Sequence, residues 1–162
     1  MKNKGYLCSN LQKYADVGSI EDVHLSEHPN PNFRRDSYKS LNGCWDICIS
    51  KDKNQPTSWT NKVNVPYAIE SPLSFVNHLL EPDEYIHYHK VLSISKDEMK
   101  PRIFLHFEGI DQIADVYINN KFVGQHIGGY TSFSFDIKPF VTEGNNDLYI
   151  RVRDVTDESY YM

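Results

Sequence analysis

The feature that most constrains this chain is the spacing of its apolar runs. From Leu41 onward, short runs rich in aromatic and β-branched residues are separated by turn residues at intervals of about ten positions. This spacing is typical of an all-β protein. Strands are expected over residues 44–50, 62–65, 85–94, 102–108, 113–119, 121–126, 132–137 and 147–153. Because antiparallel sheets must bury one face against another, eight such strands predict a two-sheet antiparallel β-sandwich of the jelly-roll kind.

Two local patterns support this interpretation. Asn119 and Asn120 stand between two apolar runs, and asparagine adopts positive φ more cheaply than most residues, so a tight two-residue hairpin is expected there. In the run 102–107, Ile103, Leu105 and Phe107 alternate with more polar neighbours, which predicts a strand with one buried face.

The domain organisation follows from where this pattern of short apolar runs begins and ends. Residues 1–40 are polar, carry Pro29 and Pro31, and suggest an arm that packs on the domain, with one helical turn near residues 19–23. Residues 41–155 form the predicted jelly-roll domain. Residues 156–162 are expected to be a truncated linker toward a missing next domain.

Charge and cysteine content exclude several classes of function. The formal net charge is −5 and no segment carries a run of Lys and Arg, so the basic footprint of a nucleic-acid-binding protein is absent. No run approaches ~18 apolar residues, so no membrane partner is expected. Cys8, Cys44 and Cys48 are odd in number, and two of them lie on one strand face, which favours reduced thiols and a cytoplasmic location.

Three segments carry a resemblance to a known family. Residues 34–50 read RRDSYKSLNGCWDICIS, residues 64–74 read NVPYAIESPLS, and residues 108–154 contain a hairpin with an Asn-containing turn, Gly-Gly-Tyr, Phe-x-Phe-Asp-Ile and a Gly-Asn before the last strand. Together these motifs, in order over some 120 residues, resemble the N-terminal sugar-binding domain of glycoside hydrolase family 2, the β-galactosidase and β-glucuronidase family. The resemblance implies a galactose-binding-domain-like jelly roll.

The resemblance also implies what this chain lacks. In the family, a retaining glycosidase carries its acid/base and nucleophile glutamates in a later (β/α)₈ barrel, so no catalytic residue and no cofactor are expected here, and the family's chain continues past Met162. One segment departs from the pattern: where many members carry Trp-Tyr-Arg-Arg, this chain has residues 87–90, His-Tyr-His-Lys. The tyrosine and one cation are kept, but the forked guanidinium pair is lost.

The candidate substrate-binding residues lie in two loops. One is a stiff loop between two prolines that carries Tyr67, Glu70 and Ser71, and the resemblance places it near the entrance to the active site. A purely structural role, with the loop packed by Tyr67 and Leu73, would explain these residues equally well. Trp59 lies in a polar loop and is the better exposed aromatic candidate for stacking on a sugar ring. Trp45 begins a strand and is expected in the core.

Asp157 is the remaining candidate, because the segment 156–160 resembles the family segment whose Asp reaches toward the sugar site of the barrel. A carboxylate there could accept hydrogen bonds from sugar hydroxyls or help to hold a cation in the intact enzyme. His87 and His89 are two apart on one strand, but no third ligand stands at a recognisable spacing, so exposed strand histidines are expected and no metal site.

These observations leave three functions open. The first is a noncatalytic sugar-binding domain of a β-galactosidase-like retaining hydrolase, which supports the catalytic barrel and contributes to substrate binding. The second is a free-standing carbohydrate-binding module, and the third is an oligomerisation domain built on edge strands. The choice between galactoside, glucuronide and mannoside lies in barrel residues that are outside this sequence.

Overall fold

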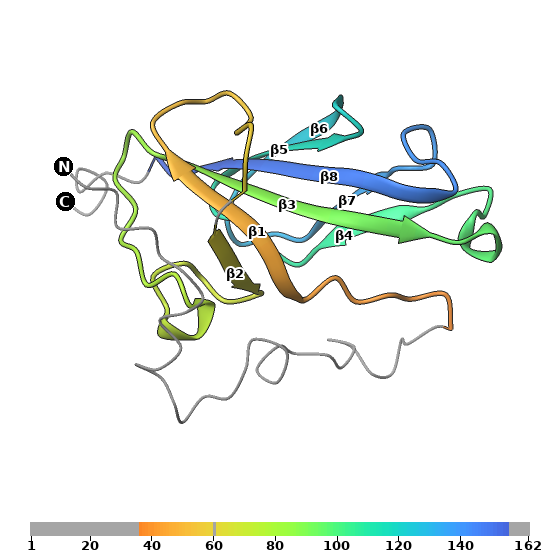
Figure 1. Ribbon diagram of the computed structural model, residues 1–162, viewed down its shortest axis with the longest axis horizontal. Helices are drawn as coiled ribbons and strands as arrows, with labels where there is room; N and C mark the ends of the chain where they lie inside the picture. The colour runs from red at the N-terminus through yellow and green to blue at the C-terminus, as the bar shows by residue number, and fades with distance from the viewer. Residues whose placement is uncertain (1–35, 60, 156–162) are drawn as a thin grey trace. The chain divides into compact units, whose positions relative to one another are not determined.

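The computed structural model describes residues 36–59 and 61–155 (Figure 1). Within these ranges the chain forms eight β-strands, two short 3₁₀ helices and no α-helix. The strands are β1 (Gly43–Ser50), β2 (Asn61–Val65), β3 (Tyr85–Ile94), β4 (Phe104–Phe107), β5 (Ile113–Ile118), β6 (Lys121–Ile127), β7 (Phe133–Asp136) and β8 (Gly144–Arg153). The 3₁₀ helices are η3 (Pro72–Ser74) and η4 (Lys96–Glu98). The arm and the linker expected from the sequence lie outside the described residues, apart from residues 36–40.

The described chain divides into two compact units. The first contains residues 36–47 and 58–79, and the second contains residues 48–57 and 80–155, so that β1 begins in the first unit and ends in the second. In the first unit, β1 pairs with β2 in an antiparallel ladder that sets Gly43 opposite Val65. Trp45 is 5% exposed, which confirms its predicted place in the core. The Trp45 indole N–H donates to the carbonyl of Leu41 at 2.7 Å.

The second unit contains two antiparallel sheets. Strands β3, β8, β5 and β6 lie side by side in that order, and β4 pairs with β7 in a separate two-stranded sheet (Figure 1). On one face of the larger sheet, alternate residues of β5 and β8 are fully or almost fully buried: Ala114, Val116, Ile118, Leu148, Ile150 and Val152. Because alternate residues of a strand point to opposite faces, this face forms the core of the unit.

The smaller sheet covers part of that face. A Cβ atom on Gly124 of β6 would lie 2.4 Å from the ring of Phe135 on β7, so the glycine lets the aromatic ring approach the strand. The Phe133 ring of β7 also stacks on His126 of β6, with ring centroids 3.9 Å apart. These contacts join the two sheets and confirm the predicted all-β sandwich of the jelly-roll kind.

The two local predictions are also confirmed. Asn119 and Asn120 have φ values of 51° and 62°, and β5 and β6 pair directly across them. In β4, Leu105 is 4% exposed whereas Phe104 is 44% exposed, as the alternating pattern indicates.

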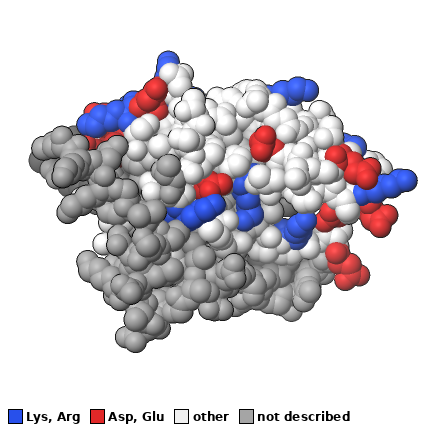
Figure 2. Space-filling view, viewed as in Figure 1, with Lys and Arg blue, Asp and Glu red and all other residues white. Residues whose placement is uncertain are grey.

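The outer surface does not separate into regions of one charge on the face that Figure 2 shows. Lys and Arg side chains lie among Asp and Glu side chains there. No helix in the described part of the chain is long and apolar enough to cross a membrane.

Candidate functional site

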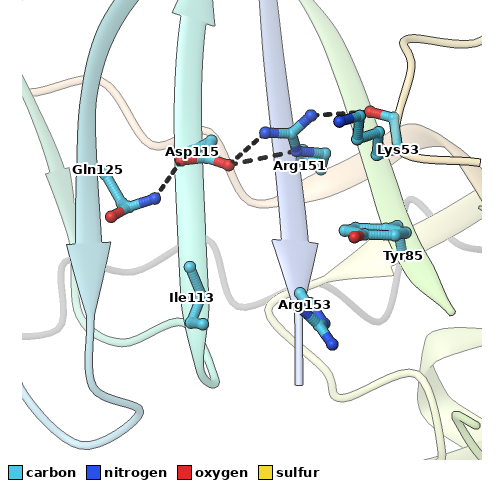
Figure 3. Close-up of a pocket in the computed structure, with 7 residues that line it drawn as sticks. All are labelled: Lys53, Tyr85, Ile113, Asp115, Gln125, Arg151 and Arg153. Atoms are coloured by element: carbon cyan, nitrogen blue, oxygen red, sulfur yellow. Dashed lines mark hydrogen bonds and ion pairs between the residues drawn. The ribbon is translucent and has the colours of Figure 1, made fainter. Parts of the chain in front are cut away.

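A pocket lies on the second unit, and strands of the larger sheet supply most of its lining (Figure 3). Its volume is about 240 Å³. Ile113 and Asp115 of β5 line it, and both alternate with the core residues of that strand. The pocket therefore belongs to the face of the sheet opposite the core. The lining residues are Lys53, Tyr85, Ile113, Asp115, Gln125, Arg151 and Arg153.

An ion pair forms the floor of this pocket. Asp115 and Arg151 stand opposite each other in the β5–β8 ladder, and Asp115 is 8% exposed. Arg151 donates from Nη2 and Nε to Asp115 Oδ2 at 2.7 and 3.2 Å. Gln125 donates to the other carboxylate oxygen at 2.7 Å. Both oxygens of the buried carboxylate are thus satisfied, as a buried charge requires.

The same arginine holds the loop that borders the pocket. Its Nη1 donates to the backbone carbonyl of Lys53 at 2.8 Å (Figure 3). Because one guanidinium bonds both Asp115 and the loop, the position of Lys53 is tied to the sheet. Burial by itself lowers the pKa of Arg151, but the hydrogen bond to Asp115 and the electrostatic effects of Tyr117, Asp115 and Tyr149 together raise it by more, so the group stays charged.

The rim of the pocket is basic and aromatic. Arg153 is exposed, and its guanidinium lies 5.8 Å from the centroid of the Tyr85 ring. Arg151 lies 5.9 Å from the same centroid. A guanidinium that stacks on an aromatic ring keeps its N–H groups available for hydrogen bonds.

His87 lies on the same sheet face, and its environment corrects a sequence prediction. The sequence predicts exposed side chains for His87 and His89, but His87 is fully buried at 0% exposure and His89 is only partly exposed. Nε2 lies 3.0 Å from the carbonyl oxygen of Asp52, and Nδ1 lies 2.8 Å from the hydroxyl of Tyr149. Since a carbonyl only accepts, Nε2–H donates to it, and in the neutral ring Nδ1 accepts from Tyr149. Burial lowers the pKa of His87 and raises that of Tyr149 to about 12.

The predicted loop of Tyr67, Glu70 and Ser71 belongs to the first unit. The Ser71 hydroxyl caps η3 by accepting from the backbone N–H of Leu73 at 3.2 Å. Glu70 is exposed and Tyr67 is partly exposed. The loop therefore presents a carboxylate to solvent, while Ser71 serves its local backbone.

The aromatic side chains differ in exposure. Trp59 is partly rather than fully exposed, and it also belongs to the first unit. Phe133 packs against Phe107 and Phe135, with centroids 4.8 and 5.7 Å away. Tyr130 is 96% exposed, so it is the aromatic side chain most open to solvent among the large apolar residues that the structure describes.

Asp157 lies outside the described residues. In the described ranges, no three His, Cys, Asp or Glu side chains are grouped so as to hold a metal ion. Cys44 and Cys48 are partly exposed and form no disulfide with each other. Burial raises the pKa of Asp111, and the negative charge of Asp154 raises it further, so these two carboxyls influence each other.

Sequence reasoning missed the pocket because its residues come from five separate segments. A signal was present, because Asp115 lies between Ala114 and Val116, and Arg151 lies between Ile150 and Val152. Charged residues with apolar neighbours on both sides in a strand are expected to be paired. The sequence did not indicate which strands would be adjacent.

Comparison with known proteins identifies the family. Residues 56–162 match the family described as "Glycosyl hydrolases family 2, sugar binding domain". A β-glucuronidase from Bacteroides fragilis is 31% identical over 115 residues, which cover 70% of this chain and 16% of that protein. A β-galactosidase from Thermoanaerobacter pseudethanolicus is 34% identical over 94 residues, which cover 56% of this chain and 12% of that protein. The chain thus spans less than a fifth of either relative.

Solved structures agree with this assignment. The crystal structure of a β-D-mannosidase from Dictyoglomus thermophilum aligns with a TM-score of 0.58 at 27% identity, covering 71% of this chain and 15% of that one. A β-D-glucuronidase structure for the same organism aligns with a TM-score of 0.55 at 26% identity, covering 72% of this chain and 19% of that one. The family match, the sequence relatives and the fold all agree, and the chain belongs to the sugar-binding domain family of glycosyl hydrolases family 2.

Proposed function

We propose that this chain is the noncatalytic sugar-binding domain of a β-galactosidase-like retaining glycoside hydrolase, in which it supports the catalytic barrel and contributes to substrate binding. The observation that carries the proposal is the family match over residues 56–162. The relatives named as β-galactosidase and β-glucuronidase are several times longer than the part that this chain matches. The catalytic barrel of the parent chain and a carbohydrate are the proposed partners.

The proposed contacts to substrate are Asp157, Tyr67, Glu70, Ser71 and Trp59. Glu70 supports this proposal best among the described residues, because its carboxylate is exposed on a loop that starts from the β2 strand and is braced by η3. Ser71 is also needed as the cap of η3, so a change at Ser71 would alter the loop as well as any contact. A cation near Asp157 in the intact enzyme is part of the same proposal.

A cytoplasmic location also belongs to this proposal. Cys44 and Cys48 form no disulfide with each other, which accords with a reducing compartment.

The test uses the parent enzyme with its barrel. Glu70→Gln should raise KM for a nitrophenyl glycoside by about tenfold, the value of one charge-assisted hydrogen bond, and should change kcat much less. Glu143→Gln is the matched control, because Glu143 is also exposed but lies in the β7–β8 connection. An unchanged KM for Glu70→Gln would remove this loop from the substrate site.

The alternative functions predict a different result with the isolated chain. A free-standing carbohydrate-binding module should bind galactosides with millimolar or tighter affinity in a calorimetric titration, whereas a supporting domain should show no heat of binding. An oligomerisation domain should show self-association in analytical ultracentrifugation without any sugar.

A further inference from the structure

We propose that the pocket lined by Lys53, Tyr85, Asp115, Arg151 and Arg153 binds an acidic monosaccharide unit, a sugar ring that carries a carboxylate or a sulfate. This inference goes beyond the proposed function, because it uses none of the residues through which that function contacts substrate. It also concerns the second unit, whereas the loop of Tyr67 and Glu70 belongs to the first.

The charge of the pocket indicates an anion. Three cations, Lys53, Arg151 and Arg153, and one carboxylate, Asp115, line it. Since Asp115 is paired with Arg151, the lining carries an excess of two positive charges, although the chain as a whole has a net charge of −5. Neither Lys53 nor Arg153 has an ion pair with a carboxylate among the described residues. Two such cations at one pocket attract an anion more strongly than either does alone.

Contacts within the protein hold the guanidinium of Arg153 and the backbone of Lys53 at the pocket. Arg153 lies over the Tyr85 ring, and the backbone of Lys53 is held by Arg151 at 2.8 Å. In Figure 3, Lys53 and Tyr85 lie on the side of Arg151 away from Gln125, and Arg153 lies farther along the same strand as Arg151. A site whose groups are held in place loses less entropy when it binds a ligand.

The size and the other lining groups indicate a single sugar ring. The volume of about 240 Å³ is below the roughly 300–1,000 Å³ of pockets for drug-sized ligands, so an oligosaccharide would not be enclosed. Ile113 supplies an apolar wall for the C–H surface of a sugar ring. The side-chain N–H of Gln125 is used by Asp115, which leaves its carbonyl oxygen to accept from a sugar hydroxyl. Arg153 suits the acidic group, because a planar guanidinium matches both carboxylate and sulfate.

The experiment titrates the full 162-residue chain and follows its ¹H–¹⁵N spectrum. Four probes separate recognition of the sugar ring from recognition of the acidic group: glucuronate, glucose 6-sulfate, glucose and acetate. Glucuronate or glucose 6-sulfate, or both, should bind saturably and shift the signals of Lys53, Gln125 and Arg153. Glucose and acetate should each bind at least about tenfold more weakly, because each lacks one of the two recognised parts.

Variants then test the named cations. Arg153→Gln and Lys53→Gln should each weaken binding of the acidic sugar by about tenfold, and Lys53→Gln keeps the backbone carbonyl that Arg151 uses. Arg102→Gln is the matched control, because Arg102 is also exposed and lies 4.6 Å from the centroid of an aromatic ring, that of Phe104, but does not line the pocket. It should bind as the unchanged chain does.

Several outcomes would overturn the proposal: no saturable binding of either acidic sugar, equal binding of glucose or acetate, or unchanged affinity in the Arg153 and Lys53 variants. If only one acidic sugar binds, the result supports the proposal and identifies the acidic group. A negative result in these titrations would not bear on the KM effect of Glu70→Gln in the parent enzyme, so the two proposals can be refuted separately.

Discussion

At the scale of single residues, His87 shows how burial sets the chemistry of a side chain. Its ring is fully buried and stacks on Tyr149, with centroids 6.0 Å apart. Its two nitrogens have partners of opposite kind, a carbonyl that accepts and a hydroxyl that can donate. This arrangement suits a neutral imidazole, and burial together with the positive charge of Arg151 lowers its pKa.

The first prediction concerns the pH dependence that follows. In the unfolded chain a histidine takes up a proton near pH 6.5, whereas folded His87 resists protonation until lower pH. The unfolded state therefore binds more protons below about pH 6.5, and stability is lost as pH falls from there toward the lowered pKa. His87 should contribute a slope of at most about 1.4 kcal/mol per pH unit in that window.

Urea denaturation at pH 7 and at pH 5, followed by tryptophan fluorescence, measures this slope. His87→Gln keeps a donor and an acceptor but does not titrate, so the variant should be less stable at pH 7 and should lose less stability on acidification. His106→Gln, which changes an exposed histidine, is the matched control. An equal loss of stability in His87→Gln and the unchanged chain would contradict the prediction.

At the scale of elements, strand positions followed from the sequence more closely than strand ends did. β8 begins at Gly144, three residues before its expected start. The sequence Gly-Asn-Asn reads as a turn, but in the structure Asn145 and Asn146 pair with β3. Asn146 is 1% exposed, and its side chain accepts from the N–H of Thr142 and donates to the carbonyl of the same residue. Tertiary pairing and these side-chain bonds override the turn preference.

The second prediction concerns the contact between β6 and β7. Gly124→Ala would place a methyl group 2.4 Å from the Phe135 ring, so it should lower the free energy of unfolding by about 1–3 kcal/mol. Phe135→Leu should relieve this clash, so the double variant should be more stable than the sum of the two single changes indicates. Thermal and urea denaturation of all four chains measures the coupling, and simple additivity would mean that the ring does not rest on β6.

At the scale of the whole molecule, the described carboxyl groups can be compared with the pair that retaining hydrolysis needs. Retaining hydrolysis needs two carboxyl groups about 5 Å apart, one protonated and one ionised. Asp115 is committed to Arg151, and Glu70 is exposed on a loop of the other unit. Asp111 and Asp154 influence each other, yet Asp111 is exposed and lies outside the pocket.

The third prediction is that the 162-residue chain alone does not measurably hydrolyse nitrophenyl glycosides. The assay compares the purified chain with the parent enzyme, which serves as the positive control. Asp111→Asn is assayed beside it, because that variant removes one carboxyl of the interacting pair Asp111 and Asp154. Turnover that persists through purification and is lost in Asp111→Asn would contradict the prediction and locate a catalytic centre in this chain.

The sequence by itself determined the all-β class, the Asn119–Asn120 hairpin, the buried face of β4 and the family, because alternation, turn chemistry and motif spacing are properties of neighbouring residues. Only the tertiary structure decided that His87 is buried and that Lys53, Asp115, Arg151 and Arg153 share one pocket. The pairing of β5 with β8 brings Asp115 and Arg151 together, and a hydrogen bond from Arg151 to the Lys53 carbonyl adds a loop from elsewhere in the chain. Strand pairing depends on contacts between residues far apart in the chain, and a single sequence contains both partners but does not show which strands will pair.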